Sequence, residues 1–152
     1  MILHHVSPKK IEKIHSNGRW GSFLFFSEDG FVYCYGETYK YTIEVQEDEI
    51  VDSSDLFSFV ESDSEEISEL VQEFAEAWEI DEDDAREHIA EQSMPDHVMD
   101  DDCATCDYAE SMQMAAANIA LALGFAGVQV EDDTGVAVMI DMTGRQLVEF
   151  AG

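Results

Sequence analysis

The chain has 152 residues, 45% of them hydrophobic and 11% aromatic, which is enough to bury one core and excludes a disordered acidic tail. Its formal net charge is −28, from 35 acidic against 7 basic residues, which argues against direct binding to nucleic acid or an anionic membrane. No apolar run approaches the roughly 18 residues of a membrane span. Because MILHHVSPKK at the N-terminus also lacks the order of a secretory signal, we expect a cytoplasmic protein.

Strands and one short helix are predicted in the first third of the chain. ILHHV at 2–6 is a strand, and a short helix follows from Pro8 to Gly18. FLFF at 23–26 is a buried strand, and YKYTIEV at 39–45 alternates between apolar and polar residues as a half-buried strand does.

Helices are predicted in the middle of the chain and strands at its end. Apolar residues recur at helical spacing, and Gly124 is expected to end the last helix. The predicted helices span 64–79, 81–92 and 104–123, and the strands 125–131, 136–141 and 145–150, with a turn between each pair of strands. This order predicts an α+β domain with mixed or antiparallel sheets.

The acidic residues are concentrated in the middle of the sequence. Residues 44–110 hold 26 acidic residues and one basic residue, Arg86. The block is expected either to dock on a basic protein, such as one that itself binds nucleic acid, or to reflect adaptation to high salt. Four of the seven basic residues lie together near the N-terminus, as a solvated helix face or a local positive patch: Lys9, Lys10, Lys13 and Arg19.

Two groups of residues could carry chemistry. The tandem His4-His5 lies on the first predicted strand, where a core histidine is the simpler interpretation. CATC at 103–106 has a metal or redox spacing, with His88 and His97 upstream, but the spacings match no standard zinc finger and nearby aspartates oppose a thiolate. We therefore expect buried or incidental thiols and no metal site.

Both ends of the sequence resemble small ADP-ribosyltransferases. The resemblance is carried by LHHVS at 3–7, GSFLFFS at 21–27, YGETYKYTIEV at 35–45 and LGFAGVQVEDDTGVAVMIDMTGRQLVEF at 123–150. Among these enzymes the chain is most similar to phage-encoded anti-CRISPR transferases that disable a type I-F surveillance complex. The resemblance implies one domain over 1–152, in which 1–50 and 119–152 form the two halves of a core around an NAD cleft, and 51–118 form an acidic, mostly helical block.

The resemblance also implies residue roles. His5 would hold the adenosine-side ribose of NAD, and Val6 and Ser7 would follow it at the cofactor, although Val6 stands where such enzymes usually have Gly. Phe25 and Ser27 would belong to the second motif, and Tyr35 would pack on the nicotinamide ring. Both aromatic residues could instead serve packing alone.

Asp132 would be the catalytic carboxylate, together with His5. Breaking the nicotinamide–ribose bond builds positive charge on the ribose, which a carboxylate beside the sugar stabilises. Strand alternation puts Val128, Val130 and Asp132 on one face of the strand. The valines are expected to be buried, so Asp132 is expected to point the same way, whereas Glu131 lies with Gln129 and is expected to face solvent.

The resemblance predicts that the chain transfers ADP-ribose from NAD to a protein. The expected target is a basic, nucleic-acid-binding subunit of a CRISPR surveillance complex in the host cytoplasm, whose DNA recognition would be blocked. Two alternatives remain at this point: an acidic mimic of nucleic acid without enzymatic activity, and an ADP-ribosylating toxin of a toxin–antitoxin pair.

Overall fold

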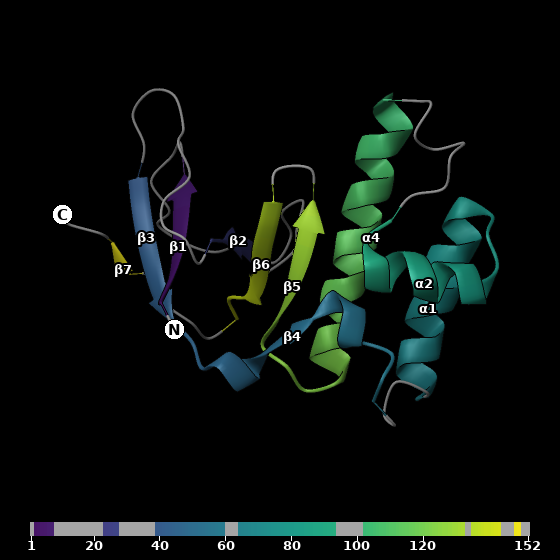
Figure 1. Cartoon of the computed structure of the whole chain (residues 1–152), viewed down its shortest axis with the longest axis horizontal. Coiled ribbons are helices and arrows are strands. Elements are labelled where there is room, and N and C mark those ends of the chain that lie inside the picture. The colour runs from purple at the N-terminus through teal and green to yellow at the C-terminus, as the bar shows by residue number, and fades with distance from the viewer. Residues whose placement is uncertain are drawn as a thin grey trace.

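Two β-sheets lie side by side, and helices cover the outer face of one of them (Figure 1). The computed structural model describes residues 2–7, 23–27, 39–59, 64–93, 102–132, 135–143 and 148–149. The predicted α+β class is confirmed by this arrangement. The helix expected from Pro8 to Gly18 lies outside the described residues.

The smaller sheet has three antiparallel strands in the order β1-β3-β7. They are β1 (Ile2–Ser7), β3 (Tyr39–Glu44) and β7 (Val148–Glu149). The first two match the predicted strands. The strand expected at 145–150 contributes β7, which pairs with β3 instead of forming a hairpin with the strand before it.

The larger sheet has four strands in the order β2-β6-β5-β4. They are β2 (Phe23–Phe26), β6 (Gly135–Asp141), β5 (Gly127–Asp132) and β4 (Ile50–Asp52). The pairs β2·β6 and β5·β6 are antiparallel and β4·β5 is parallel, so this sheet is mixed, as the sequence predicts.

Within the described residues, one isolated backbone bridge connects the two sheets. His4 of β1 and Ser27, the residue after β2, exchange both backbone hydrogen bonds, with N···O distances of 2.9 and 2.8 Å. The bridge holds the middle of β1 against the end of β2. It therefore fixes where the histidine pair lies relative to the larger sheet.

Strand alternation divides the core into two clusters. An inter-sheet cluster lies between the sheets and is built from Leu3, Phe26, Ile43, Val45, Val138, Ile140 and Met142. A helix-side cluster joins the other face of the larger sheet, through residues such as Val128, Val130 and Met139, to the apolar faces of the helices. Each face of the larger sheet is thus covered by a different layer.

The three helices predicted in the middle of the chain are confirmed. They are α1 (Glu65–Trp78), α2 (Glu82–Glu91) and α4 (Asp102–Ala122). Ser64 and Asp81 cap α1 and α2 through their side-chain oxygens, and Gly124, with φ +97°, follows α4 where the sequence places its end. No described helix is long and apolar enough to cross a membrane.

Two short 3₁₀ turns, at Glu47–Glu49 and Ser53–Asp55, flank β4. The second turn is tied to α2, because the Ser53 hydroxyl donates a hydrogen bond to the Ala90 carbonyl at 2.9 Å. This contact ties the last turn of α2 to the turn that follows the edge strand of the larger sheet.

Candidate functional site

His5 lies on β1 at the junction of the two sheets. Its Nδ1–H donates a hydrogen bond of 2.6 Å to the backbone carbonyl of Phe25. Its ring also lies 5.5 Å from the ring of Phe26, measured between centroids. His5 shares the strand face of Leu3, which belongs to the inter-sheet cluster, so the half-buried imidazole points between the sheets.

The contact with Phe25 fixes the chemistry of this ring. A carbonyl oxygen can only accept, so Nδ1 carries a proton. In the neutral ring Nε2 is then an acceptor. An acceptor at this nitrogen suits a ribose hydroxyl, so the residues present fit the sugar contact that the resemblance implies.

The first two strands bring together most of the other residues proposed at the N-terminal part of the site. Ser7 ends β1 opposite Tyr39, and Val6 occupies the alternate face of β1 from His5. Ser27 is held beside His4 by the backbone bridge, and His4 Nδ1–H also donates to the Ser27 carbonyl at 3.2 Å. The roles of these residues at the cofactor stay predictions.

Phe25 contributes two different groups. Its carbonyl oxygen orients His5, whereas its half-buried ring packs against the helix-side cluster. Packing is one of the two interpretations that the sequence allows for this ring. Its predicted contact with the cofactor is not tested by this geometry.

The sequence missed one neighbour of His5. Tyr41 of β3 lies directly opposite His5 in the antiparallel register, and its side chain is only 4% exposed. It shares a face with Ile43 of the inter-sheet cluster. Only the pairing of β1 with β3 reveals this neighbour, because the two residues are far apart in the sequence.

The end of β5 carries the proposed carboxylate. Asp132 is the last residue of β5, and its backbone pairs with Gly135. The predicted burial of Val128 and Val130 is confirmed, and both belong to the helix-side cluster. The direction of the Asp132 side chain lies outside the described part of the structure, so its place beside His5 stays a prediction.

Glu131 is exposed, as the sequence predicts. Alternation puts it on the face of β5 that also carries Gln129, whose amide donates a hydrogen bond of 3.3 Å to Asp52. Across the hairpin Glu131 is paired with Val136, which is 53% exposed. The same face of the larger sheet carries Val138 and Ile140, which belong to the inter-sheet cluster.

The remaining predicted site residues are not part of the described structure. Tyr35 and the basic residues Lys9, Lys10, Lys13 and Arg19 fall outside it, as do the side chains of Cys103 and Cys106. In the described part of the chain no group of three or more histidines, cysteines or acidic residues is arranged to hold a metal ion.

A second histidine forms a polar contact inside the helical layer. Nδ1 of His88 on α2 and the hydroxyl of Tyr108 on α4 share a hydrogen bond of 2.6 Å. Tyr108 is fully buried and makes edge contacts with the rings of Phe74 and Trp78. His88 therefore connects α2 to α4.

We expect Tyr108 to make the protein sensitive to alkaline pH. Burial, and secondarily the charge of Asp84, raises the pKa of Tyr108 from 10.0 to about 12. The unfolded chain therefore loses this proton first, and stability that is fully present below pH 10 is lost as the pH rises toward 12. Urea unfolding followed by circular dichroism should show this loss in the wild type and a smaller one in Tyr108→Phe.

The control for this prediction is the same pair of proteins at neutral pH. There Tyr108→Phe should cost about 1 kcal/mol of stability, because it removes the hydroxyl that bonds His88. If the free energy of unfolding falls equally steeply with alkaline pH in both proteins, the assignment to Tyr108 is contradicted.

The comparisons with known proteins identify the fold. The chain is similar to a solved structure described as the crystal structure of an anti-CRISPR protein, with a TM-score of 0.51 and 20% sequence identity. The similarity covers 92% of this chain and 88% of the other. No protein-family model and no curated protein matches the chain. At this identity the likeness defines a shared α+β fold.

Proposed function

We propose that the chain is an anti-CRISPR protein that acts as an NAD-dependent ADP-ribosyltransferase on a subunit of a CRISPR surveillance complex. The anti-CRISPR part is supported by a structural likeness that extends over nearly the whole chain. The transferase part is supported by the resemblance at both ends of the sequence. The observation that carries it is the orientation of His5, whose Nδ1–H is tied to Phe25 and whose other ring nitrogen suits a ribose hydroxyl.

The proposed chemistry assigns a task to each end of the core. NAD would supply the ADP-ribosyl group, whose bond to nicotinamide breaks as a bond to a nucleophile of the target forms. His5 would hold the sugar by accepting a hydrogen bond at Nε2. Asp132 would place a negative charge where the ribose becomes electron-poor. Phe26, which is buried beside His5, would help to exclude water from this junction.

The test is transfer of labelled ADP-ribose. The purified chain is incubated with NAD carrying a label on its adenine and with an assembled type I-F surveillance complex, and labelled products are mapped by mass spectrometry. We expect one subunit to gain an ADP-ribosyl group and the complex to lose DNA binding. Absence of label on every subunit, while DNA binding is still lost, would contradict the enzymatic proposal.

That contradicting result would favour a second candidate, a non-enzymatic acidic mimic of nucleic acid. Its support is the surface of 64–93, where all 12 acidic residues are exposed against one basic residue, Arg86. Such a mimic would bind its partner stoichiometrically without NAD, and high salt would release it. Inhibition that survives Asp132→Asn distinguishes it from the transferase.

A further inference from the structure

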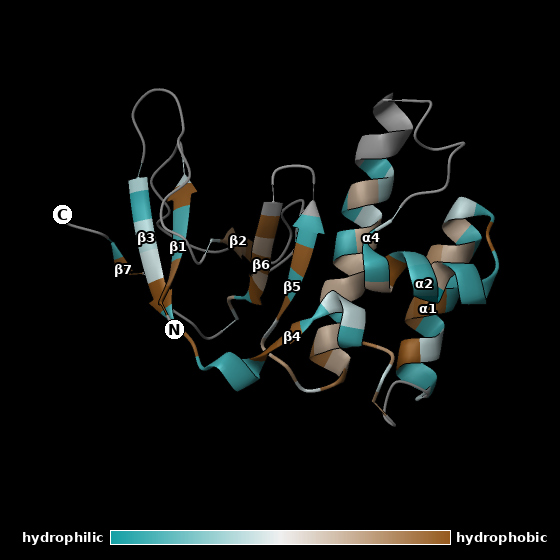
Figure 2. Ribbon diagram, in the orientation of Figure 1, coloured by the Kyte–Doolittle hydropathy of each residue, from teal (hydrophilic) through white to brown (hydrophobic). Residues whose placement is uncertain are grey.

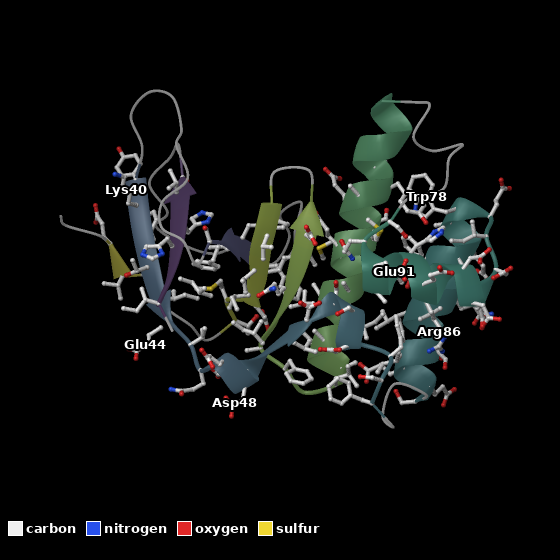
Figure 3. The ribbon with its side chains drawn as sticks, viewed as in Figure 1. Lys40, Glu44, Asp48, Trp78, Arg86 and Glu91 are labelled. Atoms are coloured by element: carbon white, nitrogen blue, oxygen red, sulfur yellow. The ribbon has the colours of Figure 1, made fainter. Side chains whose placement is uncertain are left out.

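The helical layer has a groove between α1 and α4, away from the junction of the two sheets. Its volume is about 220 Å³, and it is bounded by Leu70, Phe74 and Trp78 on α1 and by Met114, Ala115 and Asn118 on α4. Phe74 and Ala115 are buried at its base, whereas Leu70, Trp78 and Met114 are half-buried at its sides. Figure 3 shows Trp78 between α1 and α4.

The α1 wall of this groove is apolar for a sequence reason. Leu70, Phe74 and Trp78 recur every four residues, so they follow one another along a single side of the helix. Ile67 and Val71 are buried in the helix-side cluster, whereas Leu70 and Trp78 pack against it and stay half-buried. The parts of Leu70 and Trp78 that remain exposed line the groove.

A stripe of carboxylates runs along the same helix beside the apolar wall. Glu66, Glu69, Glu73 and Glu76 are spaced three and four residues apart, all are exposed, and Glu73 itself lines the groove. On α4, the exposed Asp107 lies one turn before Ser111, another lining residue. Figure 2 shows hydrophilic residues alternating with hydrophobic ones along α1 and dominating α2.

Nothing in the described layer neutralises these charges. Residues 64–93 contain one basic residue, Arg86, and its guanidinium lies 5.1 Å from the ring of Phe57. Within the described ranges no ion pair involves an acidic residue of α1. An apolar groove with one acidic edge therefore matches a segment that is apolar on one side and basic beside it.

We propose that the α1–α4 groove is the docking site for a basic amphipathic segment of a partner protein. The apolar side of the segment would fill the groove against Leu70 and Trp78, and its lysines or arginines would lie along the glutamate stripe of α1. The thioether of Met114 lets the opposite wall adapt to the shape of the segment. A second copy of this chain is disfavoured as the occupant, because each copy carries a net charge of −28.

The docking proposal goes beyond the proposed transfer and does not depend on it. The groove uses α1 and α4, whereas the proposed transfer uses β1 and the end of β5. Binding is measured without NAD, so failure to dock leaves the transferase proposal intact. Loss of transfer in Asp132→Asn would likewise leave the docking proposal intact.

The experiment uses the full chain and a fluorescein-labelled synthetic helical peptide with leucine on one side and lysine on the other. Two comparison peptides replace all lysines by glutamine or all leucines by serine. Fluorescence anisotropy at low ionic strength should show that each replacement weakens binding at least about tenfold. Equal affinity for the serine peptide would mean binding by charge alone and would overturn the proposal, as would no binding of the first peptide.

Variants of the chain locate the peptide. Leu70→Ser should weaken binding about tenfold, since it removes one of the three apolar side chains of the α1 wall. Glu73→Gln should weaken it about threefold and reduce its salt dependence, and this exposed position tests the proposal even if Leu70→Ser fails to fold. The matched control is Glu44→Gln, because Glu44 is an exposed acid on β3, on the far side of both sheets (Figure 3).

Two results with these variants would overturn the proposal. One is wild-type affinity in Glu73→Gln together with weakened binding in Glu44→Gln, which would place the peptide on the smaller sheet. The other is a dimer in sedimentation velocity that dissociates in Leu70→Ser, which would make a second copy the occupant.

Discussion

Replacing Asp132 by asparagine should lower ADP-ribosyl transfer by about a hundredfold or more. Asparagine keeps the size of the side chain, removes its charge and replaces one accepting oxygen by a donor, so the variant tests the carboxylate with little change in volume. Because Asp132 is the last residue of β5 and its backbone pairs with Gly135, the fold should tolerate the change. Initial rates of label transfer from NAD to the surveillance complex measure the effect.

The neighbouring acid provides the matched control. Glu131 is exposed and carries the same charge one residue earlier, so Glu131→Gln should transfer ADP-ribose within about threefold of the wild type. A larger loss of transfer in Glu131→Gln than in Asp132→Asn would move the catalytic role to Glu131. Glu131 lies on the same side of the larger sheet as residues of the inter-sheet cluster. Equal and unchanged rates in both variants would remove the catalytic role from this end of β5.

Substituting Gly127 by alanine should destabilise the fold by about 1–3 kcal/mol. A Cβ atom at this position would collide with the carbonyl oxygen of Met139 and lie 2.6 Å from Cδ1 of Ile140, both on β6. A backbone atom cannot move aside without disturbing the β5·β6 pairing. Urea unfolding followed by circular dichroism gives the change in the free energy of unfolding.

A second glycine distinguishes collision from backbone strain. Gly124 has φ +97° with no atom near the place of a Cβ, so Gly124→Ala should be destabilising through its conformation alone, by about 1 kcal/mol. We expect Gly127→Ala to be the more damaging of the two. Equal stability of Gly127→Ala and the wild type would mean that β5 and β6 are not packed as closely as described.

Local pattern was enough to predict the helices and the longer strands. Leu70, Phe74 and Trp78 repeat at helical spacing, and a cap residue precedes each of α1 and α2, so these helices could be read from neighbouring residues. The strand β4 was missed because Ile50–Asp52 is too short to show alternation. Its partner β5 lies far along the chain, so no local sequence pattern indicates that the two strands pair.

The candidate site was predictable only in part, for the same reason. The resemblance singles out His5, but its orientation depends on the carbonyl of Phe25, a backbone group that no sequence pattern identifies. Tyr41 is opposite His5 only through the register of β1 and β3. The alternation argument correctly buries Val128 and Val130, yet it does not say which of two cores receives them, and they pack on the helix side.

The parallel pairing of β4 with β5 bears on how this protein could change over evolution. The chain leaves the larger sheet at Asp52 on the edge strand β4 and re-enters it at Gly127 on β5, so the helical block starts and finishes on two hydrogen-bonded neighbours. Its acids on 64–93 are all exposed, while its apolar side chains face the sheet or the groove. Substitutions selected for a new partner could therefore accumulate on this surface without altering the strands that carry His5 and Asp132.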